Sequence, residues 1–145
     1  MWINRKSKRG FTLIEASLAT VIIGVGVVAM LELIAAGTRV NVDNTQRTTA
    51  TNLAKNVREY SLKLTFAQLV ALNGSSWTPP IDSRGVAVSD FGDWKQTITV
   101  SGADPNQLTK TVTLSTAKTL KLTVNVTHNG EQESSLSWYA FNATP

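Results

Sequence analysis

The chain has 145 residues, of which 42% are hydrophobic, 14 are basic, 10 are acidic and none is cysteine. This length accommodates one membrane helix and one small domain. The formal charge of +4 lies entirely in Arg5, Lys6, Lys8 and Arg9, because the remaining 10 basic residues equal the 10 acidic ones. A chain that is neutral beyond residue 10 has little electrostatic attraction for DNA, so nucleic acid is not an expected partner.

An apolar stretch from Phe11 to Ala36 follows the basic residues directly. As a helix it would extend ~39 Å, enough to cross a ~30 Å hydrocarbon core with some tilt. The basic residues would hold the N-terminus on the cytoplasmic side. We therefore predict a basic leader at 1–10, a transmembrane helix at 11–36 in the inner membrane, and a domain at 37–145 outside the cytoplasm.

Two acids interrupt this stretch. Glu32 lies ~32 Å along the axis from Phe11, at the far membrane interface. Glu15 lies one turn after Phe11, where an ionised carboxylate is costly unless water or a cation is near. Helix physics favours a Glu15 that reaches back to the inner interface and interacts with the helix dipole.

The residues around Gly10 form a recognisable signal, RKSKRGFTLIE. A basic block, a glycine, an aromatic residue and a glutamate at fixed distance resemble the processing signal of type IV prepilins and of type II secretion pseudopilins. The motif consists of Gly10 and Phe11 at the junction, Glu15, and the context residues Lys8, Arg9, Thr12, Leu13 and Ile14.

The resemblance implies a set of partners and roles. A membrane prepilin peptidase would cut after Gly10 and methylate the new amine on Phe11. Glycine allows the closest backbone approach to such an enzyme, and the exposed amine, with a reference pKa of ~7.7–8.0, needs a partner. In this family the glutamate matching Glu15 neutralises the amine of a neighbouring subunit, and such a buried ion pair sets register better than it adds stability.

Two other fates of the N-terminus compete with this one. A secretory signal peptide would be cut after its apolar region, here near Ala35-Ala36-Gly37, but its apolar region is usually ~7–15 residues. An uncut signal anchor would keep Met1. We rank prepilin processing first, secretory cleavage second and the uncut anchor third.

Gly24 and Gly26 lie in a β-branched part of the apolar stretch. Both are poor helix formers in water, but in lipid the backbone must bond internally, so a continuous helix is expected before assembly. The resemblance implies that the helix loosens here once packed in a filament. Close helix packing at small residues is the alternative.

The helical pattern continues into the polar half of the chain. Apolar residues recur at steps of three and four at Ala50, Leu53, Val57, Tyr60 and Leu64, one face of an amphipathic helix. The pairs Asp43–Arg47 and Glu59–Lys63 have the spacing that supports a helix through ion pairs. We predict one helix from Phe11 to about Leu64.

Alternation of apolar and polar residues predicts four strands at 94–101, 109–115, 120–127 and 133–141, after a short helix at 66–72 and a loop. Asn129-Gly130 is a hairpin signal. One apolar face implies an antiparallel sheet packed on the outer half of the helix. The fold class is α+β, and the arrangement resembles the pilin architecture.

Little else in the chain carries chemistry. The single His128 reads as a surface turn residue, and Asp82, Asp90, Asp93 and Asp104 lack the spacing of a calcium loop, so no metal or cofactor is expected. No catalytic constellation appears, so we predict no enzyme. Because major pilins commonly carry a disulfide, the lack of cysteine favours a minor pilin or pseudopilin. The alternative is a monomeric, membrane-anchored binding module.

Overall fold

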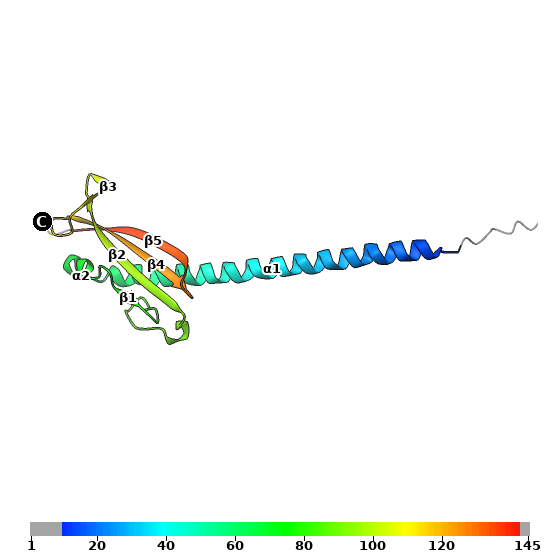
Figure 1. Cartoon of the computed structure of the whole chain (residues 1–145). Helices are drawn as coiled ribbons and strands as arrows, with labels where there is room; N and C mark the ends of the chain where they lie inside the picture. Colours follow the sequence, from blue (N-terminus) through cyan, green and yellow to red (C-terminus); the bar gives the residue numbers. More distant parts are fainter. Residues whose placement is uncertain (1–9, 143–145) are drawn as a thin grey trace, which may run out of the picture. The chain divides into compact units, whose positions relative to one another are not determined.

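The computed structural model describes residues 10–142, so the predicted context residues Lys8 and Arg9 lie outside the described part. The chain divides into two compact units, Met1–Val42 and Asp43–Pro145. Along the sequence two α-helices come first, followed by one strand, a 3₁₀ helix and four further strands (Figure 1). The α+β class is as predicted.

Helix α1 runs without a break from Leu13 to Ser61. It is shorter than the predicted 11–64 at both ends. At its start, Thr12 acts as the cap and lies outside the helix. At its end, Lys63 N and Leu64 N donate to the carbonyls of Tyr60 and Ser61, at 3.2 and 3.1 Å, in a tight turn. Thr65 then caps the short helix α2, Phe66–Ala71.

The two ion pairs predicted to support α1 do not form. The described residues contain two ion pairs, Arg84–Asp82 at 2.8 Å and Lys110–Asp104 at 3.7 Å, and neither lies on α1. Instead of pairing with Glu59, Lys63 donates to the Ser83 carbonyl at 2.8 Å. Exposed i,i+4 pairs contribute only ~0.3–0.5 kcal/mol, so solvation of the separated charges competes with them.

Between residues 13 and 36, α1 carries no charge apart from Glu15 and Glu32 and is otherwise largely apolar on every face. Its large apolar side chains there are exposed within the described part of the chain, from 51% at Val27 to 89% at Leu13. A helix that is apolar on every face needs apolar surroundings, either lipid or other helices. By length and composition, α1 qualifies as a membrane-spanning helix.

The sheet of the second unit is antiparallel and has five strands, one more than predicted. The additional strand is β1, which occupies a stretch predicted as loop and pairs with β2 through Ser76↔Thr97 and Trp77↔Gln96. The order is β1-β2-β4-β5, with β3 pairing the far end of β2. The strands are β1 Ser76–Trp77, β2 Trp94–Asp104, β3 Gln107–Val112, β4 Thr119–His128 and β5 Glu131–Phe141. The 3₁₀ helix η1, Ser89–Phe91, precedes β2.

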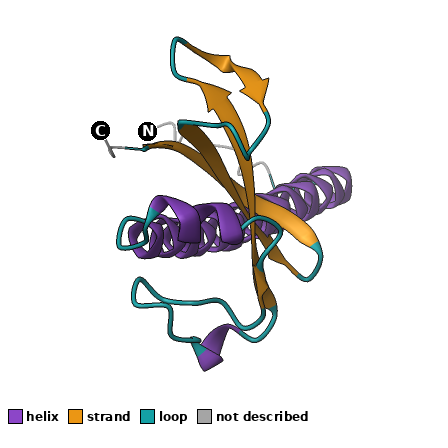
Figure 2. Cartoon of the chain, turned by 90° about the vertical axis from the view of Figure 1, so that its left-hand side faces the viewer, coloured by secondary structure: helices purple, strands orange, loops and turns teal. Residues whose placement is uncertain are grey.

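The predicted apolar faces meet in one core. The long strands cross α1 obliquely (Figure 2), and within the second unit the helix buries a stripe at Ala50, Leu53, Ala54 and Val57. Each large apolar side chain buried in this way contributes ~1.5–3 kcal/mol. The sheet residues of the core, buried or nearly so, are Trp94, Ile98, Val100, Leu120, Leu122, Val124, Val126 and Trp138.

Two glycines fix local geometry in the sheet. Asn129 and Gly130 have φ of 50° and 89° in the turn between β4 and β5, the conformation of the predicted hairpin turn. At Gly102 an added Cβ would lie 2.5 Å from the Val112 carbonyl oxygen. A side chain at Gly102 would therefore push β3 away from β2.

The polar side chain of Gln96, on β2, lies among the core residues and is 0% exposed. Its Nε2 donates to the carbonyls of Leu53 on α1, at 2.8 Å, and Ile81, at 3.3 Å, and its Oε1 accepts from the Ile81 N–H at 2.8 Å. Gln96 thus joins the helix, the sheet and the loop before β2. A pattern that follows only apolar residues does not reveal it.

Replacing this glutamine should destabilise the second unit. In Gln96→Leu the Ile81 N–H loses its acceptor in the core, and an unsatisfied buried polar group costs ~1–3 kcal/mol. Chemical unfolding of the full chain in detergent, followed by near-ultraviolet circular dichroism, measures the loss. The exposed Gln132→Leu is the matched control and should change stability little. Equal stabilities of the two variants would contradict this role of Gln96.

Candidate functional site

The predicted junction, Gly10 and Phe11, lies just before the first turn of α1. Both residues are exposed, Phe11 by 80%, and neither belongs to the helix. A Cβ built on Gly10 meets nothing within 4 Å. The described chain itself therefore places no steric demand for glycine here, and any such demand comes from a partner that handles this segment.

Thr12 and Glu15 form a reciprocal capping box at the start of α1. The Thr12 N–H and hydroxyl both donate to Glu15 Oε2, at 3.1 and 3.0 Å, and the Glu15 N–H donates to Thr12 Oγ1 at 3.3 Å. The Ala16 N–H donates to the Thr12 carbonyl at 3.1 Å. The first amides of a helix have no intrahelical acceptor, and this arrangement satisfies two of them.

The capping role of Glu15 was missed in the sequence, although its signal is present. Threonine followed three residues later by glutamate, ahead of an apolar run, is the pattern of a capping box. The same device recurs at α2, where Thr65 and Gln68 bond each other reciprocally. Glu15 therefore has a function within its own chain, which adds to the role implied by the resemblance.

The geometry of the cap leaves Glu15 able to bind a second donor. Both bonds from Thr12 end on Oε2, and a carboxylate offers about four acceptor positions on its two oxygens. Oε1 accepts no hydrogen bond within the described residues. The carboxylate can thus hold the helix start and accept from an external cation at the same time.

The other predicted residues of this region are exposed and unconstrained. Leu13 and Ile14 are 89% and 78% exposed. Helix α1 continues through Gly24 and Gly26, where an added Cβ would meet nothing within 4 Å. Loosening of the helix at these two glycines in a filament stays a prediction.

Residues of the second unit that could carry chemistry have structural roles instead. His128 ends β4 and its ring stacks on Trp94 with centroids 4.3 Å apart; it is part of the sheet, which corrects the prediction of a surface turn residue. Asp82 organises its own loop: its bond from the Val86 N–H, with further help from Arg84, lowers the pKa of its carboxyl to about 2. Within residues 10–142 no group of three potential metal ligands comes together.

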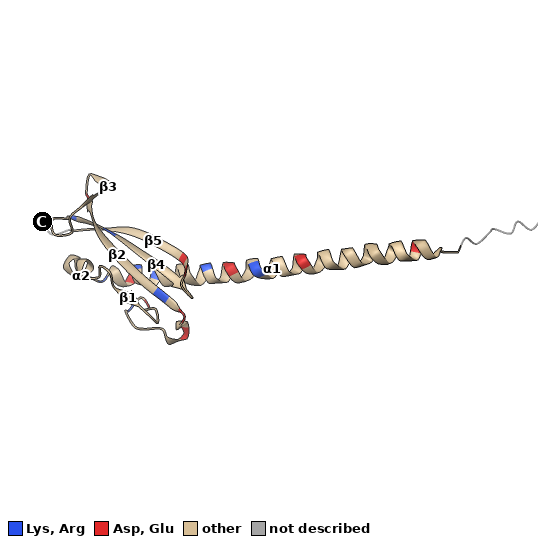
Figure 3. Ribbon diagram, in the orientation of Figure 1, with Lys and Arg blue, Asp and Glu red and all other residues tan. Residues whose placement is uncertain are grey.

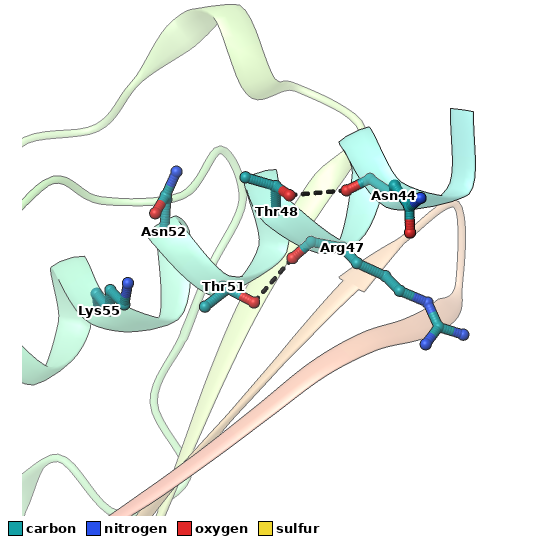
Figure 4. A pocket seen from close by; sticks show the side chains of 6 residues that line it. All are labelled: Asn44, Arg47, Thr48, Thr51, Asn52 and Lys55. Carbon is teal, nitrogen blue, oxygen red and sulfur yellow. Dashed lines mark hydrogen bonds between the residues drawn. The ribbon is translucent and has the colours of Figure 1, made fainter. Parts of the chain in front are cut away.

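A shallow hollow lies on the polar side of α1, lined by Asn44, Arg47, Thr48, Thr51, Asn52 and Lys55. Figure 4 shows that its lining comes from this one helix, with Thr48 and Thr51 turned back to donate, at 2.8 Å each, to the carbonyls of Asn44 and Arg47. The guanidinium of Arg47 extends away from the helix (Figure 4). The hollow brings together no set of converging polar groups.

These features define a class of protein. The described structure combines an exposed glycine-aromatic junction, a capped helix whose first part, residues 13–36, is largely apolar on every face, and an α+β domain. The family described as prokaryotic N-terminal methylation motif matches residues 5–31, which include the junction and Glu15. No curated protein and no solved structure matches the chain.

The match establishes that the chain carries a prepilin-type signal of the kind found in type IV pilins and pseudopilins. The chain is a prepilin-type substrate of type IV pilus or secretion systems, and pilin-like proteins with this motif are structural subunits. The motif implies processing by prepilin peptidase and assembly with other pilins. The apolar helix and the motif together fit membrane anchoring.

Loss of the cap should loosen the start of α1. Thr12→Ala removes the hydroxyl that receives the Glu15 N–H, so the amides of the first turn should exchange with solvent about fivefold faster. Hydrogen exchange followed by nuclear magnetic resonance in micelles measures this. Ser17→Ala is the control, because the Ser17 hydroxyl donates to the Leu13 carbonyl and caps nothing. Unchanged first-turn exchange in Thr12→Ala would rule out the capping role.

Proposed function

We propose that this chain is a minor pilin or minor pseudopilin, a structural subunit of a type IV pilus or a type II secretion pseudopilus. The observation that carries the proposal is the N-terminal methylation motif at 5–31, which overlaps a stretch of α1, residues 13–36, whose large apolar side chains are exposed within the described residues. A filament core of parallel helices would give those side chains their partners. The lack of cysteine supports the assignment as a minor subunit.

Prepilin peptidase would cut between Gly10 and Phe11 and methylate the new amine. Support comes from the exposed, non-helical backbone of this junction, because a peptidase must bind its substrate in an extended form. The open space around Gly10 supports a requirement for glycine that originates in the enzyme. The basic residues before it would hold the cleavage site on the cytoplasmic face of the inner membrane.

Glu15 would then align subunits. In lipid or in a helix bundle the methylated Phe11 amine is a cation without water, and it needs an anionic partner. Glu15 supplies one through Oε1 while Oε2 keeps the cap. The pair would connect the amine of one subunit to the carboxylate of the next.

The processing step has a direct test. N-terminal mass spectrometry of the chain recovered from its cell envelope should find a mature form that begins at methylated Phe11. Gly10→Leu should leave the fold unchanged and abolish cleavage. Gly37→Leu is the control, since an added Cβ at Gly37 also meets nothing within 4 Å. A chain that begins at Met1, or just after Ala36 or Gly37, would instead identify an uncut anchor or a secreted domain.

The assembly role of Glu15 is tested by removing its charge. Glu15→Leu should insert and be cleaved normally but enter filaments at a level lower by at least about tenfold, because the neighbouring amine loses its partner. Glu32→Leu, which removes the other acid of the apolar segment, should assemble normally. Quantitative immunoblotting of sheared filaments against membranes measures incorporation. Incorporation of Glu15→Leu at the wild-type level would show that Glu15 does not align the subunits. Absence of the unaltered chain from sheared filaments would favour a monomeric membrane-anchored module.

A further inference from the structure

The middle of α1 carries three charges of alternating sign, Arg39, Asp43 and Arg47, each four residues from the next. We call these residues the charge triplet. Figure 3 shows the alternation of blue and red along this part of the helix. Residues four apart lie on one face of a helix, so the triplet forms a short stripe, and all three residues are exposed.

The triplet forms no ion pair with the described part of its own chain. Neither of the two ion pairs among residues 10–142 involves it, and its side chains make no hydrogen bond there. Figure 4 shows the Arg47 guanidinium extended away from the helix. The charges are therefore free to face a partner, and their order determines which partner fits.

A second copy of the same helix fits when it is parallel and displaced by four residues, or ~6 Å along the axis. Arg39 of one copy is then level with Asp43 of the other, and Asp43 of the first is level with Arg47 of the second. The same displacement brings Phe11 of one copy level with Glu15 of the other. One offset thus satisfies the charges at both places.

Other displacements pair these charges poorly. Without displacement, every charge faces its own kind. A displacement of eight residues puts Arg39 against Arg47, and one of seven pairs Glu32 with Arg39 but leaves Asp43 unmatched. Like charges placed directly opposite repel. The order of the charges therefore favours a displacement of four residues between the two copies.

We propose that the charge triplet sets the register between parallel copies of this chain, with Arg39 and Asp43 of one copy pairing Asp43 and Arg47 of the next. The inference rests on the proposed function, because only an assembling subunit needs such a register. Apolar packing of the neighbouring segment supplies affinity, and the triplet supplies alignment. Since these pairs are exposed, their effect weakens with salt.

The natural lack of cysteine makes the register measurable. Two differently tagged full-length copies are expressed together in a bacterial inner membrane, one with Val40→Cys and the other with Asn44→Cys, both exposed positions beside the triplet. A short bismaleimide then joins thiols that lie close together. We expect this combination to crosslink about fivefold more than copies that both carry Val40→Cys, or than Val40→Cys with Thr48→Cys.

Charge variants test the cause of that preference. Asp43→Arg in both copies leaves three positive charges and should reduce the crosslink about fivefold. The triple inversion Arg39→Asp, Asp43→Arg, Arg47→Asp restores the complementary order and should restore the yield. Asp90→Arg, the same charge change in the 3₁₀ helix η1, is the matched control and should have no effect.

Several results would overturn the inference. These are a maximum yield at displacement zero or eight, a yield that ignores Asp43→Arg, no crosslink in any combination, or capture of a different envelope protein in place of the second copy. The mass-spectrometric start at Phe11 and the incorporation assay are read separately. A wrong register would therefore leave the proposed function standing, and failed processing would leave the register measurable because the triplet lies outside the leader.

Discussion

The structure depends on a hydrophobic surface that the chain cannot bury by itself. Between residues 13 and 36, α1 is largely apolar on every face, and its large apolar side chains are exposed within the described residues. Burying a single such side chain is worth ~1.5–3 kcal/mol, so the segment has a strong drive toward lipid or toward other helices. Membrane insertion and helix association both remove these apolar side chains from water. One sequence can therefore be stable both in a membrane and in a filament.

The second unit, by contrast, buries its apolar side chains within itself. Its part of α1 contributes a stripe of small and medium side chains, from Ala50 to Val57, and the sheet covers it with β-branched and aromatic residues. Ala50 and Ala54 are fully buried in this core. Gln96 then fixes the helix to the sheet and to the preceding loop through directional bonds. The two parts of α1 therefore have different surroundings. Only the part in the second unit packs against the sheet and is held by directional hydrogen bonds.

Features set by local periodicity could be predicted from the sequence, and features set by long-range or geometric detail could not. The strands around Leu122 and Trp138, the Asn129-Gly130 turn and the long helix follow from alternation, turn chemistry and apolar spacing. Strand β1 was missed because two residues carry no period, and only pairing with Thr97 and Gln96 makes Ser76–Trp77 a strand. The ion pairs expected on α1 were wrong because spacing brings two charges within reach but does not make pairing better than solvation.

At the candidate site the residues were predictable and their arrangement was not. Gly10, Phe11 and Glu15 stand out through the motif, which a family match over residues 5–31 also detects. The spacing of Thr12 and Glu15 in the sequence is that of a capping box and could have predicted their hydrogen bonds. Glu15 was interpreted instead as an isolated charge in an apolar stretch. Its place in the cap moves the helix start to Leu13.

The position of the cap relative to the junction has a further consequence. Every atom of the capping box belongs to residues 12–16, so removal of residues 1–10 would free the amine of Phe11 without touching any bond of the cap. Precursor and mature chain would then begin α1 at the same residue with the same hydrogen bonds. A maturation enzyme could therefore cut the short segment before α1 while the helix stays intact. The precursor would become the mature chain without refolding.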